Sequence, residues 1–205
     1  MTTRPPASPV LLVEDDPALR ALISIALQSR FGIVAVDSRA AALSALRSDP
    51  AIAVALVDLG LPPAPHGPGE GLALLQALRL EGLAVKAIVL TGQDQEAAAM
   101  AAVQEGAFDF LGKPASLSAI LGAIERALLF ARKEKELAAR GIARLAISAP
   151  LGEGLRNVRD AAEERLVRQV LQETAFNVHE SARRLGIKRE NVYYLLKKFG
   201  IVRDA

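Results

Sequence analysis

The chain has 205 residues, of which 51% are hydrophobic, so it is long enough for one full domain and a small second one. It contains no cysteine, which excludes disulfides and thiolate metal sites. The Pro-rich first residues hold no apolar signal region, and no apolar stretch is long enough to span a bilayer. We therefore expect a cytoplasmic protein with no membrane contact.

The net charge of +2 is unevenly distributed along the chain. Residues 1–130 carry nine Lys and Arg against thirteen Asp and Glu, a net charge of −4. Residues 165–205 carry nine against four, a net charge of +5. A basic C-terminal segment favours a polyanionic partner, although basic solvated faces are common.

Short apolar runs alternate with helical patterns along the first 130 residues. Strands are predicted at residues 10–13, 32–36, 53–58, 85–90 and 108–111, because each is a mainly apolar stretch of strand length. Helices are predicted at 17–27, 39–47, 72–78 and 96–105, the first with Asp16 as its N-cap, and a fifth begins at Ser116. Five strand–helix units in alternation predict an α/β fold with a doubly wound parallel sheet.

Polar side chains follow four of the predicted strands. Glu14 and Asp15 come after the first strand, Asp58 closes the third, Thr91 follows the fourth, and Lys113 comes after the fifth. Asp58 taken alone is equally well explained as the cap of its strand. Open α/β sheets keep their chemistry at the carboxyl ends of their strands, so these groups converge only if the strands share one sheet.

These positions carry a family resemblance: residues 8–130 resemble the receiver domain of a two-component response regulator. The resemblance implies a flavodoxin-like, five-stranded domain in which Asp58 accepts a phosphoryl group from a sensor histidine kinase. It implies a Mg²⁺ site with Asp15 as direct ligand, Glu14 acting through water, and Asp58 and the backbone carbonyl of Gly60 as further ligands. Oxygen ligands of this kind suit Mg²⁺.

The same resemblance assigns roles to three further residues. Lys113 would pair with Asp58 before phosphorylation and with the phosphoryl oxygen afterwards, and its bond to Pro114 is cis in the family. Thr91 would bind the phosphoryl oxygen, and Phe110 would follow it inward as an aromatic switch. A plain core position is the alternative for Phe110.

The loop after Asp58 departs from the receiver pattern, because it is longer than usual and places prolines on both sides of His66. We expect His66 to be a solvent-exposed loop residue in preference to a ligand or a base. The longer loop leaves phosphorylation intact but puts partner fit and the dephosphorylation rate in doubt.

The apolar face of the fifth helix continues past the receiver. Leu128 and Leu137 extend it, which predicts a signalling helix that Gly141 ends. Residues 148–154 have linker composition. We expect a receiver at 8–130, a signalling helix and linker at 131–158, and a separate domain at 159–205.

Three helical patterns occupy the last segment: 160–174, 178–185 behind Asn177 as cap, and 188–199, with Gly186 and Ile187 between the last two. This is the geometry that puts a second helix into the major groove of DNA. The segment resembles the Fis-type helix-turn-helix of nitrogen-regulator-type activators, through Asn177, residues 182–187, Arg189 and residues 196–201.

That resemblance implies which side chains are core and which reach DNA. The core would comprise Ala182, Leu185, Ile187, Val192, Leu195 and Leu196. Arg189, Asn191, Tyr193 and Tyr194 would reach DNA, with Lys188, Lys197 and Lys198 nearer phosphates. One of the two tyrosines is expected to pack. Glu190 could read a cytosine amino group, although offsetting charge is the simpler interpretation.

A central ATPase is missing, because the sequence holds no Gly-rich phosphate loop ending in Gly-Lys-Ser/Thr. The expected protein is a phosphorylation-controlled regulator that binds double-stranded DNA as a homodimer. It is not expected to be an enzyme beyond its own phosphotransfer and dephosphorylation. Two alternatives stay open: a tail that binds RNA, and a protein-binding or phosphate-sink output.

Overall fold

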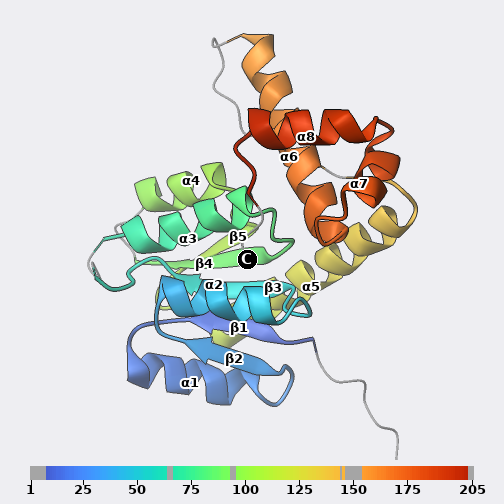
Figure 1. Cartoon of the computed structure of the whole chain (residues 1–205). Helices are drawn as coiled ribbons and strands as arrows, with labels where there is room; N and C mark the ends of the chain where they lie inside the picture. Colours follow the sequence, from blue (N-terminus) through green and yellow to red (C-terminus); the bar gives the residue numbers. More distant parts are fainter. Residues whose placement is uncertain (1–7, 64–66, 93–95, 144, 146–153, 203–205) are drawn as a thin grey trace, which may run out of the picture. The chain divides into compact units, whose positions relative to one another are not determined.

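The computed structural model of the chain describes residues 8–63, 67–92, 96–143, 145 and 154–202 (Figure 1). The chain forms two compact units. The N-terminal unit holds the chain up to Arg79 together with Ala84–Lys133, and the C-terminal unit holds Leu80–Leu83 together with the chain from Glu134 onward. Within the described residues, no helix has both the length and the apolar character needed to cross a bilayer.

The N-terminal unit is built on a parallel sheet of five strands, as the alternating pattern predicts. The strands are β1 (Val10–Val13), β2 (Ile33–Val36), β3 (Val54–Asp58), β4 (Lys86–Thr91) and β5 (Asp109–Gly112). The helices between and after them are α1 (Pro17–Leu27), α2 (Arg39–Ser48), α3 (Gly69–Leu80), α4 (Glu96–Gln104) and α5 (Leu117–Ala139). The strand order is β2-β1-β3-β4-β5, so β1 and β3 lie side by side near the middle.

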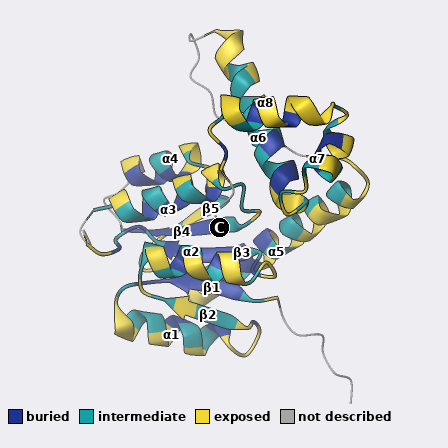
Figure 2. Cartoon of the chain, in the orientation of Figure 1, coloured by how far each residue is buried: buried dark blue, intermediate teal, exposed yellow. Residues whose placement is uncertain are grey.

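Helices cover both faces of this sheet (Figure 1). On one face, Ile23 and Leu27 of α1 and Ile120 and Ile124 of α5 join a buried cluster with alternate residues of β1, β3 and β4. The remaining strand residues point to the opposite face, where α2, α3 and α4 bury their apolar side chains. Burial on both faces explains why the central strands are continuous apolar runs (Figure 2).

The strand register sets the position of the polar residues that follow each strand. Val13 pairs with Val57, so the chain leaves β1 beside the carboxyl end of β3. Asp58 pairs with Leu90, and Thr91 pairs with Gly112. Four carboxyl ends therefore meet at one edge of the sheet.

Local hydrogen bonds fix where the helices begin. The Asp16 carboxylate accepts hydrogen bonds from the backbone N–H groups of Ala18 and Leu19, which lower its pKa and confirm its role as the N-cap of α1. The Ser116 hydroxyl accepts a hydrogen bond from the backbone of Ala119 at the start of α5. As predicted, α5 continues without a break to Ala139, shortly before Gly141.

The C-terminal unit contains α6 (Leu155–Glu173), α7 (Val178–Leu185) and α8 (Arg189–Lys198). Asn177 caps α7 by accepting a hydrogen bond from the backbone of Glu180, and Gly186 ends the helix with a left-handed φ of 66°. The predicted core is confirmed: Ala182, Val192 and Leu195 are buried, with Leu185, Ile187 and Leu196 packed against them.

The predicted start of α6 at Asp160 was wrong, because the helix begins at Leu155. Apolar periodicity detects only helical turns that face a core. The buried residues of α6 begin at Val167, and Leu155 itself is 87% exposed, so its first turns leave no such pattern.

Candidate functional site

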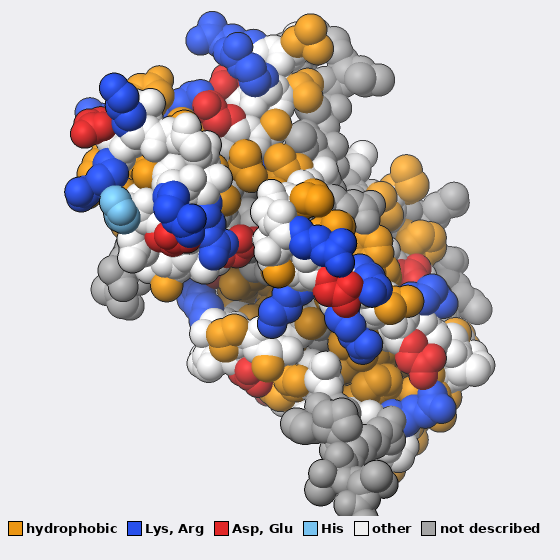
Figure 3. Space-filling model, turned by 90° about the vertical axis from the view of Figure 1, so that its right-hand side faces the viewer, with side chains coloured by type: hydrophobic (Ala, Val, Ile, Leu, Met, Phe, Trp, Pro, Cys, Tyr) orange, Lys and Arg blue, Asp and Glu red, His pale blue; other side chains and the backbone are white. Residues whose placement is uncertain are grey.

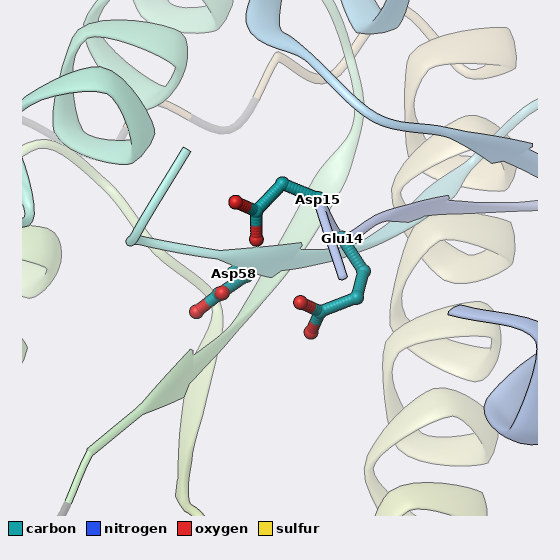
Figure 4. Close-up of side chains that lie close together, drawn as sticks. All are labelled: Glu14, Asp15 and Asp58. Carbon is teal, nitrogen blue, oxygen red and sulfur yellow. The ribbon is translucent and has the colours of Figure 1, made fainter. Parts of the chain in front are cut away.

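Three carboxylates meet where β1 and β3 end. Glu14 and Asp15 directly follow β1, and Asp58 is the last residue of β3. Figure 4 shows the three side chains turned toward one another, and one oxygen from each lies within 4.8 Å of the others. The structure thus brings together the acidic residues that the sequence places at the ends of separate strands.

Lys113 joins this cluster from the loop after β5. Its ammonium group lies 3.0 Å from Asp58 Oδ2 and 3.0 Å from Glu14 Oε2. Burial lowers the pKa of Lys113, but the hydrogen bonds to Asp58 and Glu14 outweigh it and raise the pKa above the ordinary Lys value. Lys113 therefore stays charged and holds two carboxylates at a fixed separation.

Glu14 is the most deeply buried member of the cluster, with 1% of its surface exposed. Burial raises its pKa, the hydrogen bond from Lys113 opposes that shift, and the charge of Asp58 adds to it. The Asp58 side chain is more accessible, at 13% exposed, which leaves it open to a reaction partner.

Arg20 also shapes the carboxylate site, a role that the sequence did not predict. Its guanidinium, from α1, donates hydrogen bonds to the backbone carbonyls of Glu14 at 2.6 Å and Asp15 at 3.0 Å. It thereby fixes the turn that carries both acidic side chains. The signal in the sequence is a single cation one helical turn after the N-cap, which is too common to be informative by itself.

The remaining receiver candidates lie around this cluster. Thr91 is 5% exposed at the end of β4, and its carbonyl accepts a hydrogen bond from the Lys113 N–H. The Lys113–Pro114 peptide bond is cis, as the resemblance implies. Gly60 lies in the loop after β3, and His66 falls outside the described residues.

Phe110 lies on β5 with 50% of its surface exposed. The interpretation of Phe110 as a plain core residue was therefore wrong. Side chains alternate along β5, and Phe110 falls on the outward set in the pattern of intermediate and exposed residues.

The cluster has the donor set of a divalent cation site. Three carboxylates offer oxygen ligands, which Mg²⁺ prefers to nitrogen or sulfur, and the partly open position of Asp58 leaves room for retained water. The residues present therefore fit the metal that the resemblance implies.

The DNA-binding candidates lie on or beside α8. Arg189, Asn191, Tyr193, Tyr194 and Lys197 are exposed along the helix, and Lys188 is its N-terminal flanking residue. The expectation that one tyrosine packs was wrong, because Tyr193 is 54% and Tyr194 64% exposed. The buried positions of α8 are Val192 and Leu195, and the helical repeat turns both tyrosines away from them.

Lys198 differs from the other cations of α8, because its ammonium group is engaged within the unit. It lies 2.9 Å from Asp160 and 2.7 Å from Glu163, both on α6. Hydrogen bonds to Glu163 and Asp160 raise the pKa of Lys198. A phosphate contact by Lys198 must therefore compete with two carboxylates that already hold it.

Comparisons with known families match both units. The response regulator receiver domain matches residues 10–125, and the Fis family of bacterial regulatory proteins matches residues 159–199. Similar solved folds include a response regulator receiver domain protein from Clostridium thermocellum, with a TM-score of 0.56 and 23% identity, covering 63% of this chain and 98% of that one. These likenesses show the fold of the N-terminal unit.

Two regulatory proteins show closer sequence similarity. The photosynthetic apparatus regulatory protein RegA of Rhodobacter capsulatus is 31% identical over 189 residues, which is 92% of this chain and 90% of that protein. The acid tolerance regulatory protein ActR of Sinorhizobium medicae (strain WSM419) is 34% identical over 120 residues, 58% of this chain and 59% of that one. The chain therefore belongs to the two-component response regulators, with a receiver domain followed by a Fis-type helix-turn-helix domain.

Proposed function

We propose that Asp58 is the phosphoacceptor of this response regulator and that a sensor histidine kinase is the donor. The observation that carries this proposal is the cluster at the strand ends, in which the Lys113 ammonium group lies 3.0 Å from an oxygen of Asp58 and 3.0 Å from an oxygen of Glu14. In the transfer, an Asp58 oxygen bonds to phosphorus as the bond to the donor nitrogen of the kinase breaks.

Other residues of the cluster would stabilise the charge that this step creates. The Lys113 ammonium group and the Thr91 hydroxyl would donate hydrogen bonds to the phosphoryl oxygens. Asp15, Asp58, Glu14 and the Gly60 carbonyl would hold Mg²⁺, with Glu14 acting through water. Mg²⁺, when bound, offsets the negative charge on the transferred group.

We further propose that α8 is the recognition helix and that the protein binds double-stranded DNA as a homodimer. The support is the exposed row of α8 side chains behind a left-handed Gly186 turn, which is helix-turn-helix geometry. Lys and Arg side chains lie on the surface in Figure 3, interspersed with Asp and Glu. Two copies would place recognition helices about one DNA turn apart. A DNA target is also the support for a cytoplasmic location.

The test of the phosphorylation site is labelling of the full-length protein by a small acyl phosphate with Mg²⁺ present. Asp58→Asn should abolish labelling, and Asp15→Asn should raise the Mg²⁺ concentration that gives half-maximal labelling. Asp16→Asn is the matched control, because this neighbouring acid caps α1 and is outside the carboxylate cluster. Labelling of Asp58→Asn at the wild-type level would overturn the assignment.

A further inference from the structure

Among the described residues 154–202 of the C-terminal unit, five of the six acidic side chains are held in ion pairs. Asp160 and Glu163 pair with Lys198, Glu164 pairs with Arg168, and Glu173 and Glu180 both pair with Arg184. Among the described residues 154–202, Glu190 is the one acidic side chain with no ion pair and no side-chain hydrogen bond. The alternative interpretation, that Glu190 offsets a neighbouring positive charge, therefore has no ion pair among these residues to support it.

Glu190 also occupies the centre of the outward face of α8. Val192 and Leu195 are buried, and with 3.6 residues per turn the direction opposite to them is that of Glu190 and Lys197. Tyr193 and Tyr194 flank that line, whereas Arg189 and Asn191 fall toward its edges. The surface of α8 that faces away from the core therefore has a carboxylate in its middle.

A carboxylate in this position is unfavourable for binding a polyanion unless it makes a specific contact. The other charged residues of α8 are Arg189, Lys197 and Lys198, so Glu190 is the exception on a helix surface suited to phosphates. In the major groove, Glu accepts a hydrogen bond from the N4 amino group of cytosine, whose edge carries no acceptor. The acceptors of guanine and thymine repel a carboxylate, and so does the N7 acceptor that lies beside the amino group of adenine. An unpaired carboxylate on the recognition helix is thus a discriminating group.

We propose that Glu190 determines base specificity by accepting a hydrogen bond from the N4 amino group of a cytosine in the major groove. The inference rests on the duplex binding by α8 proposed above. A Gln at this position would instead match adenine, which presents a donor and an acceptor together. The identity of residue 190 should therefore set which base pair is preferred at one position of the half-site.

The experiment selects bound sequences from a pool of randomised duplexes with the full-length wild type, Glu190→Ala and Glu190→Gln. We expect the wild type to enrich C·G at one position, Glu190→Ala to lose that preference, and Glu190→Gln to shift it toward A·T. On the wild-type sequence, the ratio of specific to random binding should fall roughly five- to 150-fold in Glu190→Ala. The other positions of the site should keep their preferences in both variants.

Three results would overturn the inference, and they are distinguishable. If Glu190→Ala selects the wild-type sequence and binds every duplex more tightly, Glu190 acts only through general repulsion. If the wild type enriches no duplex sequence, the proposed DNA binding itself fails. If Glu190 only stabilises the first turn of α8, Glu190→Ala would have a lower melting temperature, measured in parallel, and would still select the wild-type base.

Discussion

Gly71 lies where the start of α3 packs against the backbone of Asp58, the proposed phosphoacceptor. A Cβ added at this position would meet Leu59 Cα at 2.5 Å and the Asp58 carbonyl at 2.9 Å, and the Gly71 N–H donates a hydrogen bond to the Leu59 carbonyl. Both neighbours are backbone atoms, which cannot rotate aside. The longer loop after Asp58 therefore leads into a glycine that packs directly against the backbone of Asp58 and Leu59.

Gly71→Ala should consequently push the backbone of Asp58 and Leu59 away from α3. We expect a loss of roughly 1–3 kcal/mol in the free energy of unfolding, as for other overpacked sites, and slower labelling by acyl phosphate. Chemical denaturation and the labelling rate measure the two effects. Gly69→Ala is the control, because no atom of the described residues, apart from its two chain neighbours, lies within 4 Å of a Cβ there. Equal behaviour of the two variants would show that the close approach relaxes without cost.

At the residue scale, side chains at the ends of strands are predictable from the sequence. Residues that contact backbone carbonyl groups are not. Glu14, Asp58 and Lys113 could be placed together because each stands at the carboxyl end of a predicted strand, and parallel strands align their ends. Arg20 and Gly71 act on carbonyl groups whose positions depend on the assembled fold. No sequence pattern marks such contacts in advance.

At the scale of elements, α7 is stabilised by a network of ion pairs around Glu180. Arg183 and Arg184 donate hydrogen bonds to its carboxylate and lower its pKa from the ordinary 4.5 to about 2, and Arg184 also binds Glu173 of α6. Because the pKa is lower in the folded state, this contribution is complete above the unfolded pKa and is lost as the pH falls toward 2.

Glu180→Gln should therefore melt at a lower temperature than the wild type at pH 7, and the difference should shrink as the pH is lowered toward 2. Tyrosine fluorescence reports the unfolding of the C-terminal unit selectively, because the two tyrosines of the chain, Tyr193 and Tyr194, both lie on α8. Glu190→Gln is the matched control, since Glu190 has no ion pair within the described residues. A difference that does not depend on pH would contradict a role for the Glu180 charge.

Elements with one buried face were predictable, and exposed extensions were not. The strands of the sheet and helices α7 and α8 were placed correctly by their apolar patterns and by turn residues such as Gly186. The first turns of α6 were missed because they bury no apolar residue. The outward direction of Tyr193 and Tyr194 was equally hidden, because aromatic residues occur in cores and on binding surfaces alike.

At the scale of the whole molecule, the function requires that phosphorylation of one unit alters DNA binding by the other. Helix α5 runs without a break from the N-terminal unit into the C-terminal unit, which makes it the direct covalent route for that signal. We propose the division into a receiver at 8–130, a signalling helix and linker at 131–158, and a DNA-binding domain at 159–205. The number of copies on DNA then decides how many recognition helices act together.

Lys197 offers a way to count those copies. It is exposed on α8 and has no ion pair within the described residues, whereas Lys198 beside it is held by Asp160 and Glu163. Each phosphate contact contributes about 0.9 to the slope of log K against log salt concentration. Lys197→Ala should thus lower the slope by about 0.9 if one copy binds and by about 1.8 if a dimer binds. Lys198→Ala should leave the slope almost unchanged, because its charge is already neutralised within the unit.

The measurement is the affinity of the full-length protein for a selected duplex and for a random duplex across a series of salt concentrations. The affinity of Lys197→Ala should fall by the same factor for the selected and the random duplex, since a phosphate contact carries no base preference. A slope change near 0.9 would show that a single copy binds and would contradict the proposed dimer. A lower slope for Lys198→Ala would instead mean that DNA displaces Asp160 and Glu163 from this lysine, so that the ion pairs on α6 open when the complex forms.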